Sequence, residues 1–243
     1  MEAKNSKSAR TVAALIYALG VLLGMAFLAL SVWGDLEATL FESWLRADTP
    51  ISTLSCPVMI TRDEVGVISI TVDNSLDREI TVLVRTHISD GFLTLIREID
   101  TRPTILAGEA ETLTYEIEAD DAVWGLFVLN RVYVASAYPV PSRGAMCGVL
   151  VAPIAGLTGN QLVATILALS FLAMAVGLFL WARSHRPLVG RSQEMTYAMV
   201  VLMAALVVGT LISLPGQWML ALLFGVVAIF MVVTLLGNYF IGS

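Results

Sequence analysis

The chain has 243 residues, of which 57% are hydrophobic and 14% are charged, and its formal net charge is −6. Ordinary soluble domains are roughly 45–50% apolar and about 25% charged, so this composition excludes a simple soluble protein. The acidic balance argues against a nucleic-acid partner, because phosphate binding needs clustered Lys and Arg. The length allows one modest folded domain beside a few membrane-spanning segments.

Four uncharged apolar runs are each long enough to cross the roughly 30 Å hydrocarbon core of a bilayer as a helix. The first run is longer than the apolar region of a secretory signal peptide, so we expect it to remain in the protein. The predicted transmembrane helices cover residues 11–33, 161–182, 195–214 and 217–240.

Two short segments beside these runs carry an excess of positive charge. The tail over residues 1–10 and the loop over residues 183–194 each hold three basic residues against one acidic residue. Basic loops stay on the cytoplasmic side, so both segments and the C-terminus are predicted to be cytoplasmic. We therefore expect a multi-pass protein of the plasma (inner) membrane, with residues 34–160 on the outside.

Residues 34–50 follow the first run and show helical spacing of apolar side chains with charged residues between them. The pattern predicts a short amphipathic helix, and two interpretations stay open. The helix lies on the outer membrane surface, or it packs under the domain that follows. Its apolar face would be formed by Leu36, Leu40, Phe41, Trp44 and Leu45.

From Cys56 onward, apolar and polar residues alternate in short runs, as in Ile68, Ile70 and Val72. Turn signals separate these runs, and the spacing is typical of an antiparallel β-sandwich, here over residues 51–160. The expected fold class is a membrane protein with four transmembrane α-helices. One extracytoplasmic, immunoglobulin-like antiparallel β-sandwich is inserted between helices 1 and 2.

The stretch Val67–Asn74 and the later sequence Leu106-Ala-Gly-Glu-Ala-Glu-Thr-Leu113 resemble bacterial immunoglobulin-like modules of the CARDB type. Such modules repeat a strand that ends in Asn and a Gly-Glu turn that leads into a Thr-rich strand. The resemblance covers a minority of the chain and gives no match to a whole protein. It implies a module that binds, spaces or presents, and that is not a catalyst.

Cys56 and Cys147 open and close the β-rich region. In an oxidising compartment they are expected to form one disulfide, with two buried free thiols as the alternative. Closing so long a loop stabilises the fold by about 4 kcal/mol in the chain-entropy model. Neither a zinc-binding nor a haem-attachment spacing is present.

The sequence contains none of the common hydrolase, metalloprotease or nucleotide-binding motifs. His87 and His185 are interpreted as surface residues, and paired carboxylates such as Asp120-Asp121 as solvated turns. The run Asp73-Asn74-x-x-Asp77 is interpreted as a turn, with a calcium site as the alternative. We therefore expect no enzymatic activity, no cofactor and no metal.

Small residues recur four positions apart in three predicted spans, a spacing that permits close helix packing. They serve packing within the chain or docking against other membrane subunits, and both interpretations stay open. No ionisable residue lies at mid-depth of a span, which argues against an ion or proton pathway. The residues are Gly20 and Gly24, Ala173 and Gly177, and Ala221 and Gly225.

The absence of catalytic motifs beside packing helices favours a non-catalytic accessory or scaffold subunit of a larger membrane complex. Its partners would be the lipid bilayer and other integral membrane subunits. The alternative is an envelope sensor or adhesion protein whose β-sandwich recognises an outer ligand. That alternative predicts an exposed patch on the domain, with Phe92, Trp124 and Tyr138 as candidates.

Overall fold

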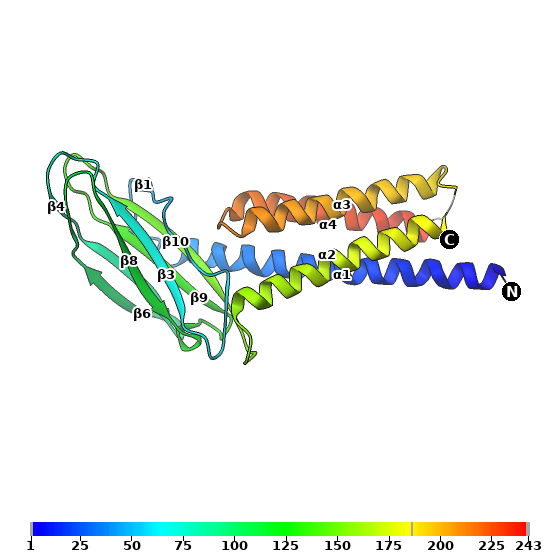
Figure 1. Ribbon diagram of the computed structural model, residues 1–243, viewed down its shortest axis with the longest axis horizontal. Helices are drawn as coiled ribbons and strands as arrows, with labels where there is room; N and C mark the ends of the chain where they lie inside the picture. Colours follow the sequence, from blue (N-terminus) through cyan, green and yellow to red (C-terminus); the bar gives the residue numbers. More distant parts are fainter. Residues whose placement is uncertain (1, 186, 242–243) are drawn as a thin grey trace. The chain divides into compact units, whose positions relative to one another are not determined.

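The computed structural model describes residues 2–185 and 187–241. Helix α1 (Glu2–Leu40) is followed by a β-rich region and then by α2 (Gly159–Ser184), α3 (Arg191–Ser213) and α4 (Trp218–Ile241) (Figure 1). The contacts divide the chain into two units, which are described separately. The helical unit contains residues 1–32 and 164–243, and the β unit contains residues 33–163.

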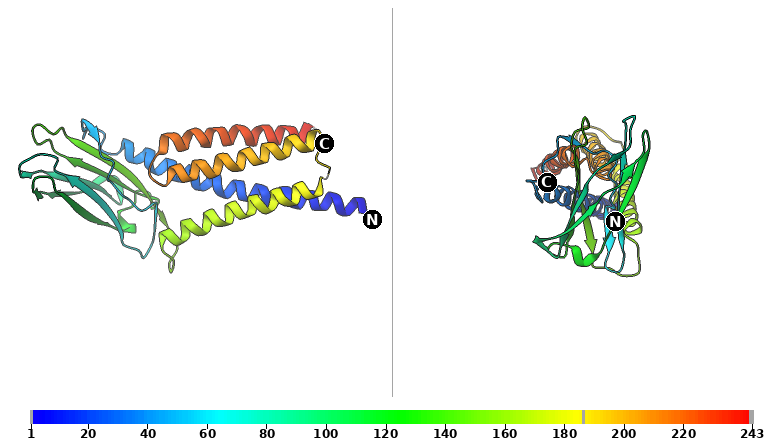
Figure 2. Two further views of the ribbon diagram at one scale, coloured as in Figure 1. Left: turned by 45° about the horizontal axis from the view of Figure 1, so that its top comes forward. Right: turned by 90° about the vertical axis from the view of Figure 1, so that its left-hand side faces the viewer.

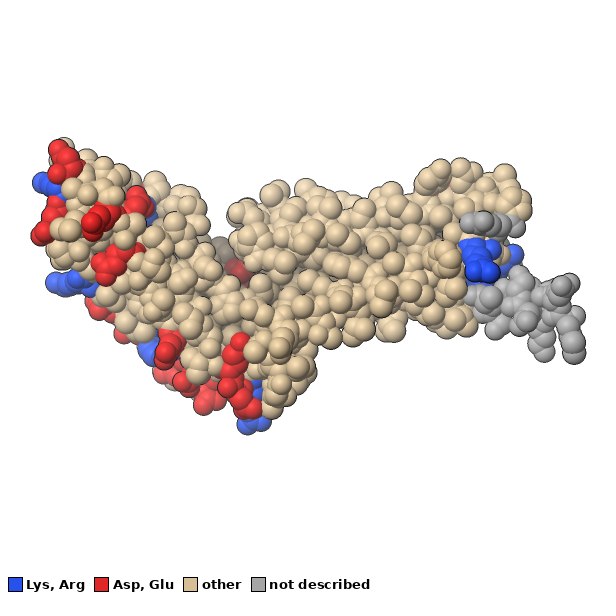
Figure 3. Space-filling model, viewed as in Figure 1, with Lys and Arg blue, Asp and Glu red and all other residues tan. Residues whose placement is uncertain are grey.

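Four helical segments are long and apolar enough to cross a membrane, by length and composition. In the space-filling view the helical unit shows uncharged surface along its length, with basic side chains at one end (Figure 3). Such helices are covered by lipid or by other helices, because water would not cover so much apolar surface. The segments are Arg10–Leu40, Gly159–Ser184, Arg191–Ser213 and Trp218–Gly237.

The helical unit has its own apolar core, to which Leu28, Met174 and Leu206 contribute. Tyr17 in α1 donates a hydrogen bond from its hydroxyl to the Met199 carbonyl of α3 at 2.6 Å. Helices α3 and α4 run side by side (Figures 1 and 2). Only 11% of the apolar window of α4 is buried, so this helix presents large side chains on most of its surface.

Besides the last turns of α1 and the first residues of α2, the β unit contains ten strands and one short 3-10 helix. They are β1 (Thr49–Pro50), β2 (Met59–Thr61), β3 (Gly66–Asp73), β4 (Ile80–Thr81), β5 (Val84–Asp90), β6 (Phe92–Thr101), β7 (Thr104–Ile105), β8 (Ala110–Ile117), η1 (Ala119–Asp121), β9 (Phe127–Val134) and β10 (Arg143–Ala152).

Six of these strands form one sheet in the order β1-β10-β9-β5-β6, with β2 also paired to β10. Strands β3 and β8 form a second, antiparallel pair, and β4 pairs with β7. Alternate residues of both sheets, such as Ile70 and Val132, point into a common apolar core. The predicted β-rich region is thus present. It differs from the expected antiparallel pattern because the short strands β1 and β2 run parallel to β10.

Helix α1 differs from its prediction at both ends. It begins at Glu2 and continues past residue 33 to Leu40, so residues 34–50 do not form a separate amphipathic helix. The helix ends where Phe41 starts a turn in which Glu42 adopts a positive φ of 50°. The five residues expected on one face are therefore divided. Phe41 is buried and Leu45 is half-buried, whereas Leu36, Leu40 and Trp44 are exposed.

Candidate functional site

The best-developed polar site of the β unit lies on the outer face of the six-stranded sheet. Successive side chains of a strand point to opposite faces, so Val84 and Ile88 enter the core while His87 points away from it. Residues 33–48 lie over this outer face, through contacts with β5, β9 and β10. We call residues 33–48 the cap segment.

Two glycines let the cap segment approach the sheet at backbone distance. A Cβ atom on Gly148 of β10 would lie 2.1 Å from the carbonyl oxygen of Gly34, which no real side chain tolerates. The amide of Gly148 also donates to Oδ1 of Asp35 at 3.2 Å. The ring of Trp33 lies 5.4 Å from that of Phe127. The last turns of α1 therefore rest directly on β10 and β9.

Arg131 of β9 holds the turn that follows α1. Its Nη1 donates to the Phe41 carbonyl and its Nε donates to the Leu45 carbonyl, both at 3.0 Å. Burial lowers the pKa of Arg131, and the nearby Glu42 carboxylate opposes this shift. The guanidinium thus satisfies two carbonyls at the end of a helix, where such groups lack partners within the helix.

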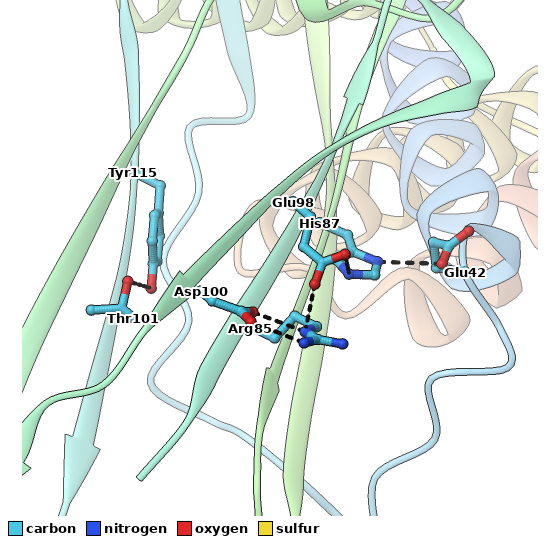
Figure 4. Close-up of polar contacts among 7 residues, drawn as sticks. All are labelled: Glu42, Arg85, His87, Glu98, Asp100, Thr101 and Tyr115. Atoms are coloured by element: carbon cyan, nitrogen blue, oxygen red, sulfur yellow. Dashed lines mark hydrogen bonds and ion pairs between the residues drawn. The ribbon is translucent and has the colours of Figure 1, made fainter. Parts of the chain in front are cut away.

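His87 of β5 lies beneath the same turn (Figure 4). Its Nδ1 lies 3.3 Å from Oε2 of Glu42, its Nε2 lies 3.7 Å from Oε2 of Glu98, and the Trp44 ring lies 6.2 Å away. His87 is only 2% exposed, so its interpretation as a surface residue is wrong. The cause is the cap segment, which covers the sheet face on which His87 stands.

Arg85 extends this cluster along β5 (Figure 4). Its guanidinium donates to both carboxylate oxygens of Asp100, at 2.8 and 2.9 Å, and lies 2.9 Å from Glu98. The hydrogen bond from Arg85 lowers the pKa of Asp100. Register places Asp100 opposite Arg85 and Glu98 opposite His87. The cluster therefore consists of cross-strand pairs that fix β5, β6 and the cap segment together.

An acidic hollow of about 220 Å³ lies elsewhere on the β unit, lined by residues 62–65 and 118–120. Glu64 in its wall accepts hydrogen bonds from the amides of Gly159 at 2.6 Å and Thr61 at 3.1 Å. This carboxylate thereby caps the first turn of α2, where negative charge is favourable. Within the described part of the chain, no group of three or more His, Cys, Asp or Glu residues is placed to hold a metal ion.

The run that begins at Asp73 forms a turn. The buried Asn74 amide donates to the carbonyls of Arg78, Ile105 and Leu106, and its oxygen accepts the Leu76 amide. This local bonding is what an Asn side chain does in a turn.

The paired carboxylates at positions 120 and 121 have different surroundings. Asp120 is exposed, but Asp121 is buried and accepts a hydrogen bond from Arg97 at 2.6 Å. Burial raises the pKa of Asp121, while the Glu118 amide and Arg97 lower it. The interpretation of both residues as solvated is therefore wrong for Asp121.

The predicted disulfide between Cys56 and Cys147 is present. Cys147 points from β10 into the core, and Ser55 beside Cys56 forms a bridge with Ser69 of β3. The bond therefore links the six-stranded sheet to the chain that lies along the second sheet. Free thiols, the alternative, are absent because both cysteines of the chain are bonded.

Three of the small residues predicted for helix packing contact neighbours within the chain. A Cβ on Gly20 would lie 2.7 Å from the backbone of Met174, and one on Gly24 would lie 2.8 Å from Ser170 Oγ. A Cβ on Gly177 would lie 2.6 Å from the Tyr17 amide. These glycines therefore serve the contact between α1 and α2.

The other three small residues are less closely packed or lie on other helices. Ala173 is half-buried and Ala221 is fully buried. Gly225 has Leu28 at 3.7 Å, which is ordinary van der Waals distance. None of these positions identifies a partner outside the chain.

The three residues proposed as an outer patch are all exposed, but they do not form one patch. Trp124 precedes the start of β9 at Phe127, whereas Tyr138 follows its other end at Val134. Eight residues of strand separate the two by roughly 25 Å. Gly91, beside Phe92, lies near the Asp120 carbonyl, so Phe92 is on the side of Trp124.

No protein-family model matches the chain, and no curated protein matches it. Solved structures similar to it include the CARDB domain of a Pyrococcus furiosus protein in complex with di-metal ions. The TM-score between the two is 0.33 and their sequence identity is 11%. The match covers 42% of this chain and 90% of that domain's chain.

Enzymes are also among the similar structures. A Paenibacillus cycloisomaltooligosaccharide glucanotransferase has a TM-score of 0.33 at 12% identity, and a Bacteroides uniformis β-glucuronidase has 0.31 at 13%. This chain spans only 14% and 12% of their lengths and gives no positive sign of catalysis. The weak resemblance to CARDB-type modules is thus confirmed, without a match to a whole protein.

Proposed function

We propose that this chain is a non-catalytic accessory or scaffold subunit of a larger membrane assembly. Its four helices span the plasma (inner) membrane, with both termini cytoplasmic and the β unit outside. The helices and the β unit both dock on partner subunits.

The observation that carries the proposal is the covered outer face of the six-stranded sheet. Arg131, Gly148 and His87 all contact the cap segment. The buried His87 and the half-buried Arg131 both hold the cap segment in a fixed geometry through polar contacts. Within the β unit, the cap segment is thus fixed on the six-stranded sheet, which suits a scaffold role.

The helical unit supports the same proposal through α4. This helix packs on α3 and leaves most of its large side chains exposed, among them Phe230 and Leu223. Lipid covers part of such a surface in a membrane, and a helix that is apolar all round also suits contact with other subunits.

The test is native sizing of the C-terminally tagged protein after mild detergent extraction, with identification of co-migrating chains. We expect one discrete complex larger than a single chain with its detergent. A photo-crosslinking residue at Phe230 should give a discrete protein adduct in the native membrane. Migration as one chain, without any adduct, would remove this proposal.

A second candidate function, an outer sensor or adhesion protein, is favoured by the exposed aromatic residues Phe92 and Trp124 near one end of the β unit. Replacing both with Ser should then abolish retention on the native envelope fraction, whereas Tyr138→Ser should not. Unchanged retention of the double variant would leave this candidate without support.

A further inference from the structure

One end of the β unit carries two turns whose large apolar side chains are exposed. The first turn leads from η1 into β9 and presents Trp124 and Leu126. The second leads from β10 into α2 and presents Ile154 and Leu157. All four residues are between 42% and 56% exposed. We call these four residues the turn patch.

The two turns lie at the same end of the six-stranded sheet. Strand β9 begins at Phe127, which pairs with Leu150 near the end of β10. The amide of Val151 donates to the Leu126 carbonyl at 2.8 Å, and Ile154 follows three residues later. The turn patch is therefore a feature of one end of this sheet.

The same end is where the chain passes between the β unit and two long apolar helices. Trp33, which ends the first apolar run, lies with its ring 5.4 Å from that of Phe127. Leu157 shortly precedes the start of α2 at Gly159, and its carbonyl accepts a hydrogen bond from Thr61 at 2.8 Å. In the proposed topology, the outer bilayer surface lies at the level of these two crossing points, and so beside the turn patch.

The charge pattern favours lipid over protein as the covering material. Figure 3 shows acidic side chains over much of the β unit, yet the sequence has no charged residue over positions 122–130 or 144–182. Interfaces between proteins have a polar rim, whereas a surface at the acyl-chain boundary excludes charge. The exposed Arg62 borders the patch, because its amide donates to the Ile154 carbonyl at 3.4 Å. At the bilayer surface such a charge meets the phosphates of lipid headgroups.

Trp124 occupies a backbone position that favours a smaller residue. The Leu126 amide donates to the Val123 carbonyl at 3.0 Å, which makes Trp124 and Gly125 the central residues of a tight turn. Their φ angles are 56° and 67°, in the left-handed region where Gly and Asn are usual. An exposed tryptophan there contributes little to the core. Tryptophan is instead enriched at membrane–water interfaces, where its ring is apolar and its N–H reaches water.

We propose that the turn patch inserts into the outer lipid leaflet, at the boundary between headgroups and acyl chains. The partner is the phospholipid surface itself, and the patch seats one end of the β unit on it. This inference rests on the membrane topology in the proposed function, but it does not need the partner subunits. Trp124 then contacts lipid and is not available to an outer ligand.

The first experiment uses the purified full chain, one copy per phosphatidylcholine nanodisc. A fluorescent amino acid replaces Trp124 or Leu157; brominated acyl chains quench it in the membrane, and iodide quenches it in water. Leu172 of α2, exposed in a predicted span, is the control for lipid. Leu106, 51% exposed, is the control for water, because it precedes the start of β8 whereas the patch lies beyond the end of that strand.

We expect brominated lipid to quench both patch positions at least twofold, as at Leu172, with little effect of iodide. Leu106 should show the reverse. Patch labels that iodide quenches as strongly as the label at Leu106, without quenching by lipid, would overturn the inference. If the label at Leu172 also escapes quenching by lipid, the membrane placement in the proposed function is wrong as well. The Cys56–Cys147 disulfide, read by a mobility shift on reduction, reports that each labelled chain is folded.

The second experiment places a photo-crosslinking residue at Trp124 or Leu157 of the chain in its native membrane. We expect adducts with phospholipid, identified by their mass. Adducts with a second copy or with a foreign subunit in place of lipid would overturn the inference, since protein then covers the patch. A chain that forms lipid adducts but migrates alone in native sizing would remove the accessory-subunit proposal and leave this inference standing.

Discussion

The contact between Gly34 and Gly148 makes a sharp prediction for the substitution Gly148→Ala. The added Cβ would lie 2.1 Å from the Gly34 oxygen and 2.2 Å from its carbonyl carbon, and both atoms belong to backbone. Overpacking costs about 1–3 kcal/mol. Moving the cap segment away from β10 would also break the hydrogen bond from the Gly148 amide to Asp35. Such a bond is worth about 1.5–3 kcal/mol when one partner is charged. We therefore expect the free energy of unfolding to fall by roughly 3–5 kcal/mol.

The assay is chemical unfolding of the detergent-solubilised protein, followed by the fluorescence of its tryptophans, two of which lie in the cap segment. Gly237→Ala in α4 is the control, because a Cβ there meets no atom within 4 Å. A Gly148→Ala variant as stable as this control would refute the claim that α1 rests on β10 at backbone distance.

Three further predictions concern the β unit. Cys56→Ala with Cys147→Ala should lower the free energy of unfolding by about 4 kcal/mol, measured against the oxidised protein by denaturant titration; a loss below about 1 kcal/mol would contradict it. Arg131→Met leaves two carbonyls of the cap segment without a hydrogen-bond donor and should lower the stability of this contact by about 2–4 kcal/mol. The expected result is faster proteolysis between residues 41 and 48, and unchanged proteolysis would count against it. Arg143 lowers the pKa of Asp73, so this pair stabilises the fold above the ordinary carboxyl pKa and loses its effect as the pH falls. Asp73→Asn should therefore reduce the loss of thermal stability between pH 5 and pH 3, and an unchanged acid profile would refute this assignment.

The sequence predicts those parts of the fold that depend on local periodicity. Long apolar runs identify the four helices, and alternation around Ile70 identifies a strand of the β unit. The pairing of Cys56 with Cys147 follows from there being only two cysteines.

The site was harder to predict because its contacts join distant parts of the chain. His87 stands on a strand with ordinary alternation, and its burial is explained only by the cap segment, in which its contact Glu42 lies 45 residues earlier. Nothing near Gly34 in the sequence indicates that it lies against Gly148. In the sequence, Asp121 cannot be distinguished from its neighbour Asp120, and only the structure shows that Arg97 binds Asp121. A single sequence contains no local sign of such pairings.

The bonds between the cap segment and Arg131 also set an order of events during synthesis. Phe41 leaves the ribosome 90 residues before its partner Arg131. In the proposed topology, the turn that follows α1 therefore enters the outer compartment before its sheet has been synthesised. Its carbonyls, the Glu42 carboxylate and the ring of Phe41 stay in water until β9 and β10 have been translocated. During that interval the new chain is held only by its first membrane segment, and a chaperone or a partner subunit would have its best access to the uncovered cap segment then.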